Sequence, residues 1–261
     1  MKKMISMLLV FLMCTALFAG CGNAADTDSD LAYVQNKGKL IVGITDYAPM
    51  DYKDENGQWT GFDAEFAMLF AEELGVECEF YVIADWGKKF MELDTKLIDV
   101  VWNGMTITDE ATLNSSVSDP YVINAQVVVM KADVISAYET VDSLSGLKIA
   151  VESGSAGETA ANAIAGANVI PVGDQAATLL EVKSGAADAC VIDITMAYAM
   201  TGEGTNYADL APGISLTEEF YGVSFRKGSE LTEKLNAFMA ELKENGTLQT
   251  LAEKYNLTLA E

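Results

Sequence analysis

The hydrophobic and polar positions of this chain alternate between strand-like and helix-like patterns. Residues 39–44 (KLIVGI) form a short, almost entirely apolar run, which is typical of a buried strand. Over residues 63–74 the apolar side chains recur every three or four positions from Phe66 to Leu74, and Gly75 follows where a C-terminal cap belongs. This spacing predicts a helix over residues 63–74.

The alternation continues through the next thirty positions. It predicts a strand over 79–83, a short helix over 86–94 and a strand over 98–102. An order in which strands and helices alternate in this way is typical of a parallel sheet with helices on both faces. The first half of the chain is therefore predicted to be an α/β unit.

A polar break follows the strand predicted at 98–102, in the segment Asn103-Gly104-Met105-Thr106-Ile107-Thr108. In open α/β sheets, ligands bind just outside the carboxyl ends of the strands. Gly104 allows close approach of the backbone, and the threonines offer hydroxyl groups. The break is a candidate ligand contact, although most strands end in a polar loop that binds nothing.

The same rhythm restarts in the second half of the chain. Residues 147–151 (LKIAV) repeat the pattern of 39–44, and residues 184–193 repeat that of 95–103. Two related lobes are therefore predicted. One further strand and two helices follow, over residues 220–225, 229–246 and 247–255. We expect this last part to return to the first lobe.

Together these elements predict an α/β fold of two lobes, each a mainly parallel sheet flanked by helices. The chain is expected to cross between the lobes near residues 127–131 and 218–222, and two crossover linkers permit a hinge with a cleft between the lobes. The predicted parts of the chain are a signal peptide over 1–20, a tether over 21–37, one lobe over 38–128 with 220–261, and the other lobe over 129–219.

The first 21 residues have the pattern of an export signal. Two lysines precede an apolar run over residues 4–18, and Ala19-Gly20-Cys21 forms a small-residue cleavage site. The run is short for a membrane span. The pattern resembles a bacterial lipoprotein signal, which implies lipid on the Cys21 thiol and a place on the outer face of the cell membrane, or in the periplasm. Phe18 stands where leucine is more usual, and plain secretion is the alternative.

The chain is strongly acidic, with 39 aspartate and glutamate residues against 16 lysine and arginine residues. Its formal net charge is −23, and removal of Lys2 and Lys3 with the signal leaves −25. This balance argues against nucleic acid or an anionic membrane surface as a partner. It favours cationic ligands at long range, although acidity can also serve solubility alone.

Cysteine and histidine usage excludes several kinds of chemistry. Cys14 and Cys21 belong to the signal, whereas Cys78 and Cys190 lie in different apolar segments, where two buried free thiols are expected rather than a disulfide. The sequence holds no histidine and no CxxC pair. We therefore expect no zinc site, no histidine-based triad, and no metal or other cofactor.

Several motifs occur in an order that is similar to that of one known family. They are the lipoprotein start, GITDYAPMDY, WTGFDAEFAMLFAEELG, IDVVWNGMTIT, SDPY, VESGSAGE, ADACVID, FYGVSFRKGS and the closing helices. This pattern resembles the bacterial extracellular solute-binding proteins of the polar amino-acid type (family 3), which serve ABC importers. The resemblance implies a periplasmic-binding-protein-like fold that closes on an amino acid. It also implies a monomer that docks on an ABC permease in the membrane and is not an enzyme.

The resemblance implies a ligand site drawn from both lobes. The implied contacts are an aromatic lid at Tyr47 and Tyr52, a wall at Trp86, first-lobe polar groups at Asn103, Gly104 and Thr106, a second-lobe loop at Ser155 and Ala156, and an acid at Asp193. Amide groups of the second-lobe loop can hold a carboxylate near a helix start. Asp193 is expected to grip the ammonium group of the ligand, and its alternative role is to cap the helix that follows.

One position departs from the family pattern. Family members usually carry an arginine five residues after the position of Thr106, where it pairs with the α-carboxylate of the ligand in a bidentate fork. Here that residue is Ala111, and the only arginine of the sequence is Arg226, in the returning strand, where a structural role is expected. The usual carboxylate clamp is therefore absent or rebuilt.

Three interpretations of the ligand stay open. In the first, Lys88 or Lys89 supplies the positive charge for an amino acid, as a looser point-charge contact. In the second, backbone amides at Thr106 and Ser155 carry the carboxylate alone. In the third, the ligand is an amine without a carboxylate, held by Asp193 and an aromatic box. That box would consist of Tyr47, Tyr52, Trp86 and Trp102.

An enzyme on the same fold is the rival function from another class, since relatives of this family include dehydratases that act on cyclohexadienyl acids. Such an enzyme needs a general acid in the cleft and a clamp for carboxylates. Only Asp193 stands out as a candidate acid in the sequence. Ala111, in the place of the arginine, counts against an anionic substrate.

Overall fold

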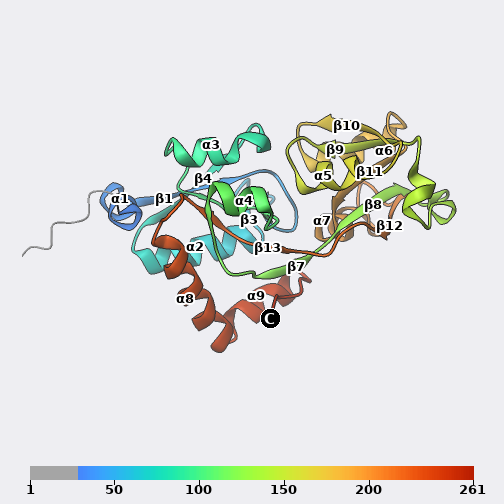
Figure 1. Ribbon diagram of the computed structural model, residues 1–261. Helices are drawn as coiled ribbons and strands as arrows, with labels where there is room; N and C mark the ends of the chain where they lie inside the picture. The colour runs from blue at the N-terminus through green and yellow to red at the C-terminus, as the bar shows by residue number, and fades with distance from the viewer. Residues whose placement is uncertain (1–28) are drawn as a thin grey trace, which may run out of the picture.

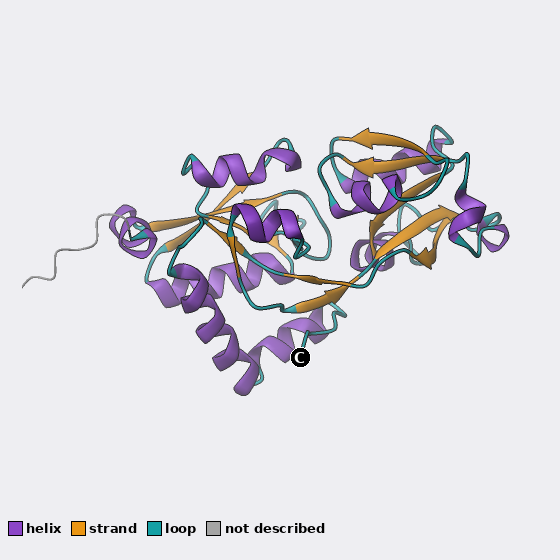
Figure 2. Ribbon diagram, viewed as in Figure 1, coloured by secondary structure: helices purple, strands orange, loops and turns teal. Residues whose placement is uncertain are grey.

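The chain folds into two lobes joined by two short strands (Figure 1). The computed structural model describes residues 29–261, so that the predicted signal peptide, Cys21 and the first part of the predicted tether lie outside the described residues. Each lobe contains one five-stranded sheet with helices packed on its faces (Figure 2). The predicted two-lobed α/β fold is confirmed.

The first lobe is built on the sheet β4-β1-β5-β14-β6. β1 (Lys39–Ile44) runs parallel to β4 (Glu77–Val82) and to β5 (Val100–Val101), whereas β14 (Ser224–Phe225) runs antiparallel to β5 and to β6 (Ser116–Val117). β1, β4 and β5 confirm the three strands predicted for this half, although β5 is shorter than expected. The sheet is mixed because the strand that returns from the second lobe enters it in the opposite direction.

Helices surround the first sheet. They are α2 (Phe62–Leu74), α3 (Lys89–Asp94), α4 (Asp109–Asn114), α8 (Leu231–Glu244) and α9 (Thr247–Lys254), with the 3-10 turn η1 (Trp86–Lys88) ahead of α3. α2 confirms the helix predicted from its apolar spacing, and Gly75 caps it in the left-handed conformation.

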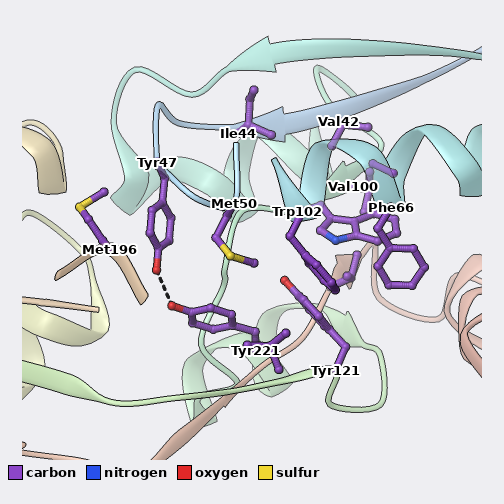
Figure 3. Close-up of a cluster of buried hydrophobic side chains, with 14 of the residues drawn as sticks. Val42, Ile44, Tyr47, Met50, Phe66, Val100, Trp102, Tyr121, Met196 and Tyr221 are labelled. Atoms are coloured by element: carbon purple, nitrogen blue, oxygen red, sulfur yellow. Dashed lines mark hydrogen bonds between the residues drawn. The ribbon is translucent and has the colours of Figure 1, made fainter. Parts of the chain in front are cut away.

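An aromatic cluster forms the core under α2. Phe66 lies edge-on to Trp102, with ring centroids 4.8 Å apart, and Phe66 also contacts Tyr121 at 6.2 Å (Figure 3). Edge-to-face aromatic pairs of this kind add to the hydrophobic gain of burial. Trp102 is fully buried and belongs to this core, so it does not form part of the aromatic box considered from the sequence.

The segment expected to end a flexible tether instead contains helix α1 (Asp30–Lys37). Ser29 caps its start by accepting a hydrogen bond from the Ala32 amide, and Gly38 ends it in the left-handed conformation. The apolar Val34 is fully buried against the first lobe. The prediction of a tether was wrong here because it overlooked the two capping residues, Ser29 and Gly38.

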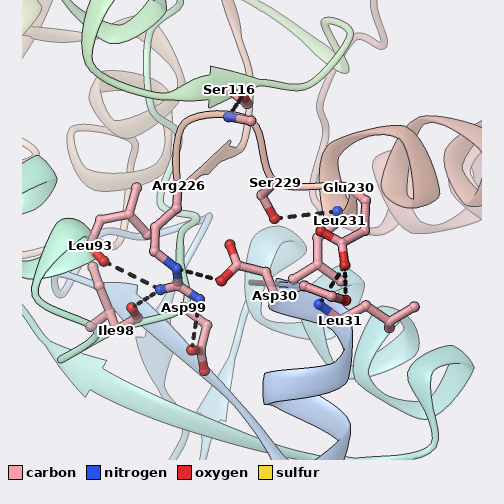
Figure 4. A network of polar contacts seen from close by, with 12 residues as sticks. Asp30, Leu31, Leu93, Ile98, Asp99, Ser116, Arg226, Ser229, Glu230 and Leu231 are labelled. Atoms are coloured by element: carbon pink, nitrogen blue, oxygen red, sulfur yellow. Dashed lines mark hydrogen bonds and ion pairs between the residues drawn. The ribbon is translucent and has the colours of Figure 1, made fainter. Parts of the chain in front are cut away.

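Arg226 fastens this helix to the sheet. Its Nε donates to Asp30 Oδ1 at 2.8 Å, and its guanidinium group also reaches Asp99 Oδ1 at 3.3 Å and the carbonyl oxygen of Ile98 at 2.8 Å (Figure 4). A buried guanidinium group needs such partners, because an unpaired buried charge is costly. The expected structural role of the arginine agrees with this network.

The second lobe is built on the sheet β10-β9-β11-β8-β12. Its strands are β8 (Gln126–Lys131), β9 (Lys148–Glu152), β10 (Asn168–Val172), β11 (Ala189–Asp193) and β12 (Leu210–Ser215). Helices α5 (Ala156–Asn162), α6 (Gln175–Ser184) and α7 (Ile194–Met200), with the short turns η2 (Ile135–Ala137) and η3 (Val141–Leu144), complete the lobe. This sheet is mixed as well, since β8 runs antiparallel to both β11 and β12. Both sheets were predicted to be mainly parallel, but parallel and antiparallel pairs are equally frequent in each, because the strand that follows each crossover runs against its neighbours.

The two lobes are connected by β7 (Val122–Asn124) and β13 (Glu219–Tyr221), which pair antiparallel. The second crossing lies where the sequence predicted it. The first lies earlier, because residues 127–131 already form part of β8 in the second sheet. The single strand predicted over 220–225 is divided at Gly222, where a Cβ would approach the side chains of Ile107 and Val117 to under 3 Å.

Candidate functional site

A cleft of about 650 Å³ lies between the lobes, a size that suits one small ligand. The cleft is lined by Tyr47, Trp86, Lys89 and residues 103–111 of the first lobe, by Gln126, Glu152, residues 154–156, α5, Gln175 and Asp193 of the second, and by residues 217–219 of the returning crossover. This lining includes seven carboxylate side chains and a single basic one, Lys89. The field in the cleft therefore favours a ligand with positive charge.

Gly104 sets the shape of the first-lobe wall. Its φ is +53°, and a Cβ at this position would lie 2.6 Å from the Tyr47 ring and 3.2 Å from that of Tyr221. Only glycine takes this conformation and this contact without strain. Its amide donates to Asp63 Oδ2 at 2.5 Å, which fixes the loop after β5.

The other two polar groups predicted on this wall make bonds inside the protein. The Asn103 side chain donates to Asp51 Oδ2 at 2.7 Å and to the Thr45 carbonyl oxygen at 3.1 Å. The Thr106 hydroxyl donates to Glu219 Oε1 at 2.8 Å. Both residues line the cleft, but these side chains hold the wall in place.

Tyr47 lines the cleft and joins the two lobes. Its hydroxyl is 2.7 Å from Thr195 Oγ1 of α7 and is also hydrogen-bonded to the Tyr221 hydroxyl. Tyr52, predicted as a second lid residue, does not line the cleft. The chain reverses between Tyr47 and Asp51, and Tyr52 then pairs with Thr60 in the hairpin of β2 (Tyr52–Lys53) and β3 (Trp59–Thr60).

The second-lobe loop lies where the sequence predicted it. Ser155 and Ala156 line the cleft at the start of α5. The Ser155 hydroxyl accepts from the Glu158 amide at 3.0 Å and donates to the Glu152 carbonyl oxygen at 2.8 Å, and the Ser155 amide donates to that same oxygen at 3.3 Å. Because both groups are engaged, the interpretation in which the Ser155 amide binds a carboxylate loses support.

Asp193 ends β11 at the floor of the cleft, and 3% of its surface is exposed. Its Oδ1 accepts hydrogen bonds from Asn124 and, at 2.8 Å, from Gln126, and its Oδ2 accepts one from Gln175. Burial, reinforced by the charge of Glu219, raises the pKa of Asp193 to about 7. It occupies the N-cap position of α7, but its side chain makes no capping bond. The site role is therefore favoured over the capping alternative.

Sequence reasoning missed Glu219 and the amide side chains around it. Glu219 Oε1 accepts from Asn124 at 2.6 Å and from Gln126 at 2.7 Å, so the same two amides bond both Glu219 and Asp193. Gln126 lies 67 positions before Asp193 and 93 before Glu219. No local pattern marks such a cluster; only the polar side chains in otherwise apolar strands could have drawn attention to it.

The two candidate lysines occupy different environments. Lys88 is exposed and pairs with Asp85, 2.8 Å away, outside the cleft. Lys89 is buried, and its Nζ donates to the carbonyl oxygens of Trp86 in the first lobe and of Gly154 in the second, at 3.3 Å each. Burial lowers the pKa of Lys89, whereas Glu110 and Glu152 oppose that shift.

Ala111 lies in the first turn of α4, which Thr108 caps by accepting from the Ala111 amide at 3.1 Å. It lines the cleft and is almost fully buried. The position at which the family pattern has an arginine therefore does face the ligand space, and in this chain it contributes only a methyl group.

Comparisons with known proteins agree with this geometry. The family model described as "Bacterial extracellular solute-binding proteins, family 3" matches residues 40–258. The chain is 32% identical over 251 residues to the L-cystine-binding protein TcyJ of Escherichia coli (95% of this chain, 94% of TcyJ). It is 30% identical over 260 residues to the arginine-binding extracellular protein ArtP of Bacillus subtilis (98% of each).

Among solved structures, the chain is similar to the ancestral amino acid-binding protein AncCDT-1, which is described as a precursor of cyclohexadienyl dehydratase. The TM-score is 0.81, with 34% identity over 87% of this chain and 99% of AncCDT-1. Both lobes are covered at these lengths, so the similarity extends to the cleft and its two crossovers.

Proposed function

Because the chain belongs to the bacterial extracellular solute-binding proteins, family 3, we propose that it captures one polar amino acid in the cleft and delivers it to an ABC permease. None of the helices within residues 29–261 has the length and apolar character of a membrane span. We place the protein outside the cytoplasmic membrane, held there by lipid on Cys21. Amino acids are also the ligands that the names of its relatives give for them.

One observation carries this proposal: Asp193 is a buried carboxyl group that lies at the meeting point of the two lobes and faces the cleft. Amide side chains from β7, β8 and α6 fix its position, so it is already oriented before a ligand arrives. A pre-oriented carboxylate in a desolvated site binds an ammonium group more strongly than a surface carboxylate does. We assign Asp193 to the α-ammonium group.

We assign the α-carboxylate to Lys89. Its two bonds to carbonyl oxygens leave one of the three ammonium donors for a ligand. Lys88 is paired away from the cleft and the Ser155 amide is engaged, so Lys89 is favoured over Lys88 and over a carboxylate site that needs the Ser155 amide. A lysine contact is less directional than the arginine fork of the family pattern, which is consistent with the methyl group at Ala111.

The proposed mechanism is closure of the two lobes about β7 and β13. Asp193 belongs to the second lobe and Lys89 to the first, so an amino acid that contacts both stabilises the closed arrangement. Two direct contacts between the lobes accompany it, from Tyr47 to Thr195 and from Lys89 to the Gly154 carbonyl oxygen. The ligand gains the second set of contacts only on closure, so binding shifts the population towards the closed form.

The rival function is enzymatic, on the pattern of the dehydratase named in the description of AncCDT-1. Asp193, with its pKa raised to about 7, has the acidity of a general acid. Release of product from a cyclohexadienyl acid by the purified protein would favour the enzyme.

The test is a thermal-shift and calorimetry screen of the mature chain against the common amino acids. At a concentration one hundred times its dissociation constant, a ligand stabilises the native state by about 2.7 kcal/mol. Stabilisation by at least one polar amino acid, lost in Asp193→Asn, is the expected result. A screen in which no amino acid binds, or in which Asp193→Asn binds as tightly as the parent, contradicts the proposal.

A further inference from the structure

Glu152 is a buried carboxyl group in the cleft, and one of its two oxygens has no hydrogen-bond partner in the described structure. It ends β9 and lines the cleft, and 3% of its surface is exposed. Its Oε1 has no hydrogen-bond partner within residues 29–261. A buried polar atom without a partner costs about 1–3 kcal/mol, more when it is charged, so its presence calls for an explanation.

The position of Glu152 is fixed by the loop that follows it. Its carbonyl oxygen accepts bonds from the amide and the hydroxyl of Ser155, which in turn caps α5. The side chain is therefore attached to a rigid strand end and not to a mobile surface. A rigidly held acceptor is suited to a directional contact with a ligand.

The charges around Glu152 do not neutralise it. Burial, reinforced by the charges of Asp193 and Asp174, raises the pKa of Glu152 to about 8, although the Gln175 side chain acts against this shift. Lys89 opposes this shift, but its Nζ is bonded to carbonyl oxygens, and no ion pair with Glu152 occurs in the described part of the chain. In the cleft as a whole, acidic side chains greatly outnumber basic ones.

We propose that Glu152 is a specificity residue that binds a second cationic group, at the far end of the ligand, so that the cleft selects dibasic amino acids over neutral ones. This assignment rests on the proposed function, because Asp193 and Lys89 hold the amino-acid end. A neutral amino acid satisfies those two residues and leaves the free oxygen of Glu152 without a partner. A ligand with a guanidinium or terminal ammonium group supplies the missing donor and the compensating charge.

The test compares L-arginine with L-citrulline, which has the same length and the same amino-acid end but a neutral urea group. Both are titrated calorimetrically into the parent chain, Glu152→Gln and the control Glu203→Gln. Glu203 is exposed in the same lobe and lies outside the cleft, so its substitution removes the same charge without touching the site. Asp193→Asn is titrated in parallel to report on the amino-acid end.

The parent is expected to bind L-arginine at least tenfold more tightly than L-citrulline. Glu152→Gln should lower the affinity for L-arginine at least tenfold and leave that for L-citrulline within twofold of the parent, so that the preference disappears. Glu203→Gln should keep the preference of the parent. If Glu152→Gln weakens the binding of both ligands equally, Glu152 acts at the amino-acid end, through Lys89 or the α-ammonium group, and the inference is overturned. Binding of L-citrulline or another neutral amino acid in preference to L-arginine would overturn the inference alone. Binding of no amino acid would overturn the proposed function as well.

Discussion

Asn124 and Glu219 face each other across the two crossover strands, and the Asn124 amide joins Glu219 to Asp193. The two residues are register partners in β7 and β13, and Asn124 Nδ2 donates to Glu219 Oε1 at 2.6 Å and also to Asp193 Oδ1. Gln126 makes the same two bonds, at 2.7 and 2.8 Å. Asp193, which we assign to the α-ammonium group of the ligand, is thus hydrogen-bonded directly to β7, one of the two strands about which the lobes would turn.

The stability of the ligand-free protein is expected to fall as the pH rises from about 5 to about 8. Burial raises the pKa of Asp193 and of Asp63 to about 7 and that of Glu152 to about 8. Between the unfolded values near 4 and these folded values, the folded protein holds protons that the unfolded chain has lost. Stability present at the lower pH is therefore lost as each carboxyl group ionises. Melting temperatures across this range check the sign.

Glu219→Gln provides the control for that pH dependence. The charge of Glu219 contributes to the raised pKa of Asp193, so its removal should lower that pKa and reduce the fall in melting temperature. Asp193→Asn should abolish the part of the fall in melting temperature that comes from ionisation of Asp193. A melting temperature that rises steadily from pH 5 to pH 8 in the parent chain would contradict the assignment of raised pKa values.

Binding of a cationic amino acid is expected to release protons near pH 7. The positive charge of the ligand stabilises the ionised forms of Asp193 and Glu152. Lys89 acts in the same direction on Glu152, whereas the charges of Glu219, near Asp193, and Asp174, near Glu152, oppose ionisation. Affinity for L-arginine should therefore increase from pH 6 to pH 8. Calorimetric titration in two buffers with different ionisation enthalpies measures the number of protons released. Proton uptake, or an affinity that falls over this range, would show that these carboxyl groups are not the ligand contacts.

The sequence predicted the parts of this fold that depend on local order. The apolar spacing that ends at Gly75 identified α2, and the polar break after β5 marked one wall of the cleft. Tyr52 was misplaced because a reversal of the chain just before it could not be seen in the motif. Glu219 and Gln126 were missed because their meeting depends on how two distant crossover segments pair. Long-range polar contacts of this kind follow from topology and leave no periodic signal.

Gly104→Ala is expected to destabilise the protein and to weaken ligand binding. The substitution forces a left-handed backbone on alanine and places a Cβ 2.6 Å from the Tyr47 ring, so the expected loss is about 2–4 kcal/mol in free energy of unfolding. Gly57→Ala is the matched control, since Gly57 has φ +77° but nothing within 4 Å of a Cβ. It should cost only about 1 kcal/mol. Denaturant unfolding of both variants separates the contact from the conformational strain; equal losses would contradict the close approach.

Lys89→Met is expected to weaken the binding of ligands that carry an α-carboxylate and to leave the binding of ligands without one intact. L-arginine and agmatine, its decarboxylated form, make the comparison. Loss of a buried charge-assisted bond should reduce L-arginine affinity at least tenfold, whereas agmatine should bind as well or better because a nearby positive charge is gone. Lys88→Met, at the exposed neighbour paired with Asp85, should change neither. If Lys89→Met leaves L-arginine unchanged, a ligand without a carboxylate becomes the better interpretation.

Ala111→Arg in the Lys89→Met background is expected to restore L-arginine binding. Ala111 lines the cleft on α4, so a guanidinium group placed there can reach the carboxylate that has lost its partner, with the two-point geometry that lysine lacks. Affinity for L-arginine should return to within about threefold of the parent, whereas agmatine should bind more weakly because it meets a new positive charge without a carboxylate to offset it. Melting curves of the double variant establish that it is folded. A folded double variant with no gain for L-arginine would show that the ligand's carboxylate does not lie between α4 and Lys89.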